Sequence, residues 1–117
     1  METKSLSEST ICCFGDSTTW GDNGCGGGGN DISWTSHLGA LLGGAVVENF
    51  GIKGSRIAIK ADRTDSFVER LDGIDDAADI YIVFGGVNDF SRNVPLGELG
   101  STDVHEFYGA LDYLIRT

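Results

Sequence analysis

The stretch that most constrains the fold of this chain is residues 11–19, where a short apolar run ends abruptly at Gly15, Asp16 and Ser17. A buried strand that stops at these three residues leaves a hydroxyl group at its carboxyl end. Ligands bind at that edge in open α/β sheets, and a glycine permits the sharp turn that holds a serine in an exposed position. The stretch therefore predicts a buried strand followed by Ser17 as a candidate reactive group.

Apolar runs and helical patterns alternate along the rest of the chain. Strands are predicted over residues 11–14, 45–49 and 79–84, and helices over residues 34–42, 62–71 and 102–116. The first helix carries Trp34, Leu38, Leu41 and Leu42 on one stripe, and the third strand is apolar enough to be covered on both faces. The alternation predicts an α/β fold with a parallel sheet and right-handed crossovers.

Length and charge limit the class of protein. A chain of 117 residues is long enough for a single small domain, here residues 1–117. Its formal net charge of −10 excludes nucleic acid and anionic membrane surfaces as partners, because both require a basic face. No run is long and apolar enough for insertion into a membrane.

The cysteines and the first ten residues bear on the cellular compartment. Cys12 and Cys13 are adjacent, so in a strand they point to opposite faces and do not bond each other. With Cys25 they match no zinc pattern, and we expect no metal. Residues 1–10 lack the order of a signal peptide, so we predict a cytoplasmic protein, with a removed leader as the alternative.

Several of the eighteen glycines fall in residues 24–29, which predicts a mobile loop close to the serine. A phosphate-binding loop ends in Gly-Lys-Ser/Thr and runs into a helix, whereas Gly29 is followed by Asn30 and Asp31. We therefore expect no phosphate and no cofactor at this loop.

Each predicted strand is followed by a loop with a polar or glycine residue, and parallel strands bring all three loops to one edge of the sheet. The first loop carries Ser17, the second is residues 49–54, and the third contains Asn88. A hydroxyl, a backbone N–H at a glycine and a carboxamide are the groups that acyl transfer requires, since the donors stabilise the charge on the carbonyl oxygen.

These three stretches resemble the sequence blocks of the SGNH hydrolases, the GDSL esterase and lipase superfamily. Residues 14–17 resemble the first block, 49–54 the second and 86–89 the third. The resemblance implies a three-layer α/β/α, flavodoxin-like fold with sheet order 2-1-3, and a small-molecule carboxylic or sugar acetyl ester as substrate. It makes Ser17 the nucleophile. The implied oxyanion hole consists of the Ser17 and Gly54 backbone N–H groups and the Asn88 side chain, with Asp16 and Asp89 as supporting residues.

The chain departs from this family at the acid and base. The family's last block, Asp-x-x-His, has no match here, and the two histidines are His37 in the first helix and His105 in Asp103-Val104-His105. We expect neither histidine to be catalytic. We therefore expect the chain to be the N-terminal part of an SGNH hydrolase domain without its C-terminal strands and helix, and inactive alone. The third strand would then lie at an open edge, which predicts self-association.

Simpler interpretations stay open for each block. Ser17 would serve as a helix cap, Gly54 and Gly51 as turn glycines, and Asn88 with Asp89 as an Asx turn. The alternative function is a non-catalytic module that binds a small ligand or a cofactor on a flavodoxin-like fold, since a fold does not define a function.

Overall fold

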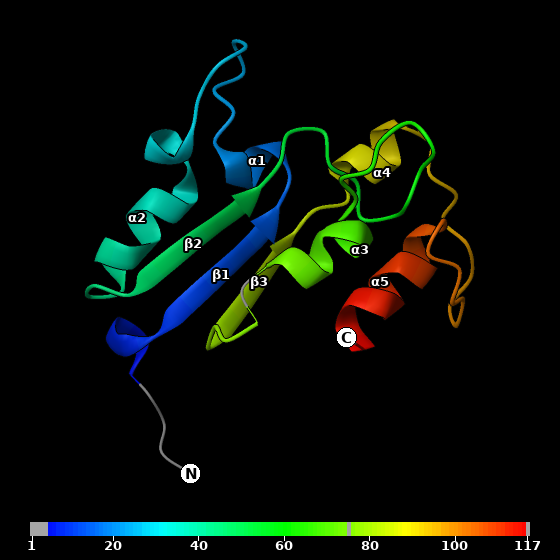
Figure 1. Cartoon of the computed structure of the whole chain (residues 1–117). Helices are drawn as coiled ribbons and strands as arrows, with labels where there is room; N and C mark the ends of the chain where they lie inside the picture. Colours follow the sequence, from blue (N-terminus) through cyan, green and yellow to red (C-terminus); the bar gives the residue numbers. More distant parts are fainter. Residues whose placement is uncertain (1–4, 75, 117) are drawn as a thin grey trace. The chain divides into compact units, whose positions relative to one another are not determined.

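The computed structural model describes residues 5–74 and 76–116, which form two compact units. Unit 1 holds residues 5–53, 74 and 76–84, and unit 2 holds residues 54–73 and 85–116. The elements of both are labelled in Figure 1. The expectation of a single domain stays a prediction.

Unit 1 is built on a three-stranded parallel sheet. The strands are β1 (Thr10–Gly15), β2 (Val46–Gly51) and β3 (Ile80–Phe84), in the order β2-β1-β3 (Figure 1). The register places Gly15 opposite Gly51 on one side and Phe84 on the other. The predicted parallel sheet with order 2-1-3 is confirmed, and the carboxyl ends of its strands are aligned.

The central strand carries the core of unit 1. Ile11, Cys12, Cys13 and Phe14 are each at most 1% exposed, as expected for a strand with a neighbour on both sides. Cys12 and Cys13 are both outside any disulfide, which confirms that they do not bond each other. Burial raises the pKa of the Cys13 thiol to about 11, so this group stays protonated and is a poor nucleophile near neutral pH.

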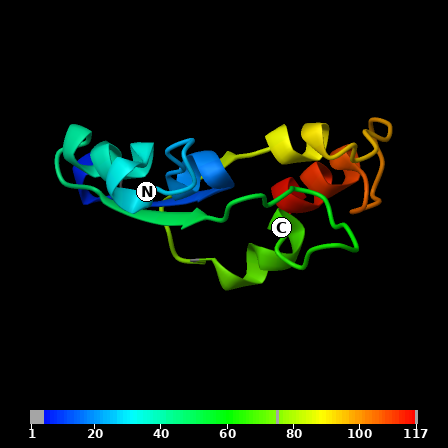
Figure 2. The same ribbon diagram turned by 90° about the horizontal axis from the view of Figure 1, so that it is seen from above.

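Helices cover one face of this sheet. The helical segments are η1 (Leu6–Glu8), α1 (Ser17–Trp20), η2 (Asn30–Ile32) and α2 (Trp34–Leu41), and α1 and α2 lie on the same face (Figure 2). The Ser33 hydroxyl caps α2 by accepting the Thr35 N–H. Trp34, Leu38 and Leu42 of the predicted stripe pack against the core, but Leu41 is 81% exposed, so the stripe is narrower than expected.

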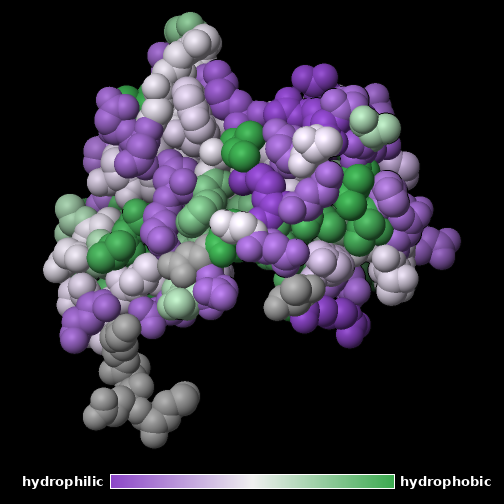
Figure 3. All heavy atoms as spheres, in the orientation of Figure 1, coloured by the Kyte–Doolittle hydropathy of each residue, from purple (hydrophilic) through white to green (hydrophobic). Residues whose placement is uncertain are grey.

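The expectation that β3 is covered on both faces is wrong. Ile80 and Ile82 pack against the core of unit 1, whereas Tyr81, Val83 and Phe84 are 43%, 47% and 47% exposed. Side chains alternate between the faces of a strand, so Tyr81 and Val83 lie on the face opposite Ile80 and Ile82, whereas Phe84 is exposed as the last residue of β3. In the described part of the chain β3 pairs with β1 alone. Figure 3 shows hydrophobic atoms exposed among hydrophilic ones on the face that it presents.

We predict that this edge causes concentration-dependent self-association, because an apolar edge strand without charges offers unpaired backbone groups to a second copy. Val83→Lys, which places a charge on β3, is expected to shift the protein to monomer in sedimentation velocity. Val87→Lys is the control, since Val87 is 66% exposed and lies in no strand. A wild-type protein that stays monomeric at every concentration would contradict the prediction.

Unit 2 is helical and irregular. Its helical segments are α3 (Phe67–Arg70), η3 (Leu71–Gly73), α4 (Val87–Ser91) and α5 (Phe107–Arg116). Phe67 on α3 and Ala110 on α5 are fully buried, and the two helices contact each other. In the described residues, no helix is of the length and apolarity needed to span a membrane.

Three boundaries differ from the sequence predictions. The helix predicted over 62–71 begins at Phe67, because a reciprocal capping box between Ser66 and Glu69 starts it there. The helix predicted over 102–116 begins at Phe107, because Asp103 ties the preceding residues into a turn by accepting the His105 and Glu106 N–H groups. The third predicted loop, which contains Asn88, includes the helix α4.

Candidate active site

Ser17 is the first residue of α1, two positions after Gly15, the last residue of β1. Asp16 is 3% exposed and caps α1, its carboxylate accepting the Thr18 N–H at 3.1 Å. The helix ends after one turn at Gly21, whose φ of 107° is in the left-handed region. Ser17 is half-buried and lies on a short, capped turn, and the cap is Asp16 rather than Ser17.

The turn that carries Ser17 is anchored by β2. The Thr19 carbonyl oxygen accepts the Asn49 side-chain amide at 2.7 Å and the Ser33 hydroxyl at 2.6 Å. Gly51 lies in β2 and not in a turn, and a Cβ there would overlap the backbone of Thr19 and Trp20. Sequence reasoning missed Asn49 as an individual residue and took Gly51 for a turn glycine, although both lie in the second block.

In unit 2, the segment after Gly54 is held by the segment after β3. Gly54 has a φ of 79°, and the Asn88 amide donates to the Ser55 carbonyl oxygen at 3.0 Å. Asp89 is 2% exposed, and its two carboxylate oxygens accept the Ile57 and Ala58 N–H groups at 2.8 and 3.0 Å. These contacts support the prediction that Asp89 holds a loop.

The same segment contains two ion pairs. Arg56, 5% exposed, pairs with Asp62, and Arg63 pairs with Asp65 through two hydrogen bonds of 2.9 and 2.5 Å. The guanidinium of Arg63 holds the pKa of the Asp65 carboxyl below its usual value, and Arg56 does the same for Asp62. Both carboxylates are therefore charged at neutral pH and serve as partners for arginine.

The two histidines lie on exposed surface. His37 is an exposed residue of α2 in unit 1. In unit 2, His105 Nδ1 lies 3.0 Å from Asp103 Oδ1, and both side chains are more than half exposed. The pKa of the Asp103 carboxyl is lowered mainly by the hydrogen bond from the His105 backbone N–H, and also by the hydrogen bond from the His105 ring. Within the described residues of unit 1, no hydrogen bond joins His37 to Ser17.

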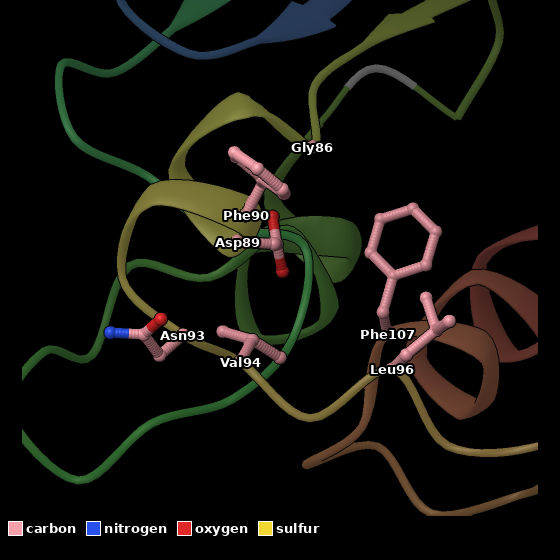
Figure 4. A pocket seen from close by; sticks show the side chains of 7 residues that line it. All are labelled: Gly86, Asp89, Phe90, Asn93, Val94, Leu96 and Phe107. Atoms are coloured by element: carbon pink, nitrogen blue, oxygen red, sulfur yellow. The ribbon is translucent and has the colours of Figure 1, made fainter.

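A pocket of about 580 Å³ opens on unit 2. Its lining residues, drawn in Figure 4, are mostly apolar: Gly86, Asp89, Phe90, Asn93, Val94, Leu96 and Phe107. The one carboxylate among them is already hydrogen-bonded to backbone N–H groups. Within residues 5–74 and 76–116, no group of three His, Cys, Asp or Glu side chains is arranged to hold a metal ion.

The parallel sheet defines the class of protein. Gly15, Gly51 and Phe84 are aligned at the carboxyl edge, and the three candidate segments follow them in sequence. This is the ligand-binding edge of open α/β folds. The chain belongs to the GDSL-like lipase/acylhydrolase family, whose model matches residues 13–117.

Solved structures agree with this assignment. One crystal structure has a TM-score of 0.95 and 96% sequence identity, covering 97% of this chain and 52% of its own. A protein from Lactobacillus plantarum has a TM-score of 0.74 and 34% identity, covering 95% of this chain and 50% of its own. No curated protein matches the chain.

A possible lipase from Chitinophaga pinensis has a TM-score of 0.71 at 22% identity, covers 93% of this chain and 42% of its own, and shows the fold alone. The chain therefore spans about half the length of the solved structures that it matches.

Proposed function

We propose that this chain carries the nucleophile and the oxyanion donors of a serine acylhydrolase that cleaves carboxylic or sugar acetyl esters. The observation that carries the proposal is the register of the sheet. The register aligns the carboxyl ends of the three strands, and Ser17, Gly54 and Asn88 each follow one of these ends in the sequence. The chain that carries them belongs to the GDSL-like lipase/acylhydrolase family.

In the proposed reaction the Ser17 oxygen attacks the ester carbonyl and its hydroxyl proton passes to a base. The negative charge that develops on the carbonyl oxygen is stabilised by the Ser17 and Gly54 N–H groups and by the Asn88 amide. The alcohol leaves with a proton, and water then hydrolyses the acyl-enzyme. The proposal requires the Gly54 and Asn88 donors to reach the oxygen of a carbonyl bound at Ser17.

The local contacts favour these roles. One Asn88 N–H is used by the Ser55 carbonyl, which orients the amide, while the NH2 group carries a second N–H. Asp16 and Asp89 are buried acceptors of backbone N–H groups, which suits supporting residues. Removing one oxyanion donor typically costs about 10²- to 10³-fold in rate.

A fluorophosphonate probe tests the proposal directly. Ser17 is expected to form an O–P bond as the P–F bond breaks, with fluoride leaving and the hydroxyl proton passing to water. Labelling should be slow, because a serine without its base keeps only the part of catalysis that the oxyanion hole supplies. Mass spectrometry of peptides should place the adduct on Ser17 ahead of the other serines.

Ser17→Ala is expected to abolish that adduct, with Ser36→Ala, an exposed serine of α2, as the matched control. Labelling spread evenly over exposed serines, or none at Ser17, would overturn the proposal. Retention of a small ligand with no adduct would instead favour a binding module.

A further inference from the structure

The Arg63 guanidinium lies against the face of Gly54 where any other residue would carry its side chain. A Cβ built on Gly54 would be 2.6 Å from Arg63 Nη1 and 3.1 Å from Cζ. The contact therefore exists because residue 54 has no side chain, and the φ of 79° at this position also favours glycine.

Asp65 holds the guanidinium in that position. Its carboxylate accepts Arg63 Nε–H at 2.9 Å and Nη2–H at 2.5 Å, a bidentate arrangement that fixes the plane of the guanidinium. Asp65 is itself tied back to the loop, because its carbonyl oxygen accepts the Ser55 hydroxyl at 2.6 Å and Arg70 Nε–H at 3.0 Å. The Arg63–Asp65 pair and the segment after Gly54 thus form one hydrogen-bonded network.

Ser55 joins this network to Asn88, whose amide donates to the Ser55 carbonyl oxygen. The φ angle of Gly54 sets the direction of the Gly54 N–H relative to the peptide groups that follow it. A side chain that restrains this φ angle, as Arg63 would by its contact with Gly54, therefore also restrains the direction of the Gly54 N–H relative to the Asn88 amide.

We propose that Arg63 and Asp65 are positioning residues for the Gly54 N–H, keeping it in a fixed direction relative to the Asn88 amide. This inference rests on the proposed function, in which those two groups are oxyanion donors. The pair does not touch the reacting atoms, and its contribution is the preorganisation of one donor, on which electrostatic stabilisation of a transition state depends.

The test is the rate of Ser17 modification by the fluorophosphonate in the full chain. Arg63→Met, which keeps much of the side-chain volume and removes the bidentate pairing, is expected to lower that rate about tenfold to a hundredfold, the range for a misplaced group. Arg63→Lys is expected to fail to restore it, because an ammonium cannot reproduce the planar fork. Asp65→Asn should cause a similar loss, and the double variant Arg63→Met/Asp65→Asn no further loss.

Two readouts separate positioning from a role in folding alone. Arg63 and Asp65 are 38% and 26% exposed, so the pair contributes little to stability, and Tm is expected to change by less than about 5 °C. Arg116→Met, which breaks the exposed Arg116–Asp112 pair of α5, is the matched control and is expected to leave the labelling rate unchanged.

Labelling of Arg63→Met at the wild-type rate, or a loss that only follows the unfolded fraction, would overturn the inference while leaving the proposed function intact. A wild-type chain that does not label at Ser17 would overturn the proposed function, and the inference with it.

Discussion

Residues 1–117, purified as a single chain, are expected to hydrolyse p-nitrophenyl acetate about 10⁴- to 10⁶-fold more slowly than a serine hydrolase with a complete triad. A serine hydroxyl is a weak nucleophile unless an adjacent base removes its proton. His37 is exposed on α2 and His105 is paired with Asp103 on the exposed surface of unit 2, so we expect neither to act as that base. This prediction has the largest expected effect on activity.

Steady-state hydrolysis measured beside Ser17→Ala checks it, and the two proteins should differ little. His105→Ala should leave the residual rate unchanged, because its exposed pair with Asp103 is expected to have no catalytic role. Added imidazole should accelerate modification of Ser17 in the wild-type chain by accepting the proton of the hydroxyl. Ser17-dependent turnover at ordinary enzymic rates, about 1 to 10³ s⁻¹, would contradict the prediction.

Asp89→Ala is expected to destabilise the protein by roughly 2 to 6 kcal/mol. The substitution leaves the buried N–H groups of Ile57 and Ala58 without their acceptor, and an unsatisfied buried donor costs about 1 to 3 kcal/mol. Because whole domains are stable by only about 5 to 15 kcal/mol, this loss is a large fraction of the total free energy of unfolding.

Urea denaturation followed by circular dichroism measures this change. Asp89→Asn should give a smaller loss, since its amide retains one oxygen acceptor in place of two. Asp72→Ala removes the same charge from an exposed position of η3 and is expected to stay within about 0.5 kcal/mol of the wild type. Equal stability of Asp89→Ala and Asp72→Ala would show that the two hydrogen bonds contribute nothing.

The resemblance to the GDSL family could be predicted from the sequence because the residues that carry it are neighbours in the chain. Three short blocks, each after a predicted strand, resemble the GDSL pattern, and the matched region of residues 13–117 agrees with that resemblance. The roles of Ser17, Gly54 and Asn88 stay predictions, because they concern a bound substrate. The contact of Arg63 with Gly54 has no local signal, because the two residues are nine positions apart and lie in no common helix or strand.

Local patterns alone determined the buried strand β1 and the parallel direction of the strands, because these depend on apolar periodicity and on the alternation of strands and helices. The sheet order 2-1-3 was implied by the resemblance to the SGNH hydrolases. The tertiary structure decided the exposed face of β3 and the anchoring of loop residues by Asn49 and Asp89. Asp89 reaches backbone groups 31 and 32 positions away in sequence. Contacts across such distances depend on how the whole chain packs, and no local pattern of residues records them.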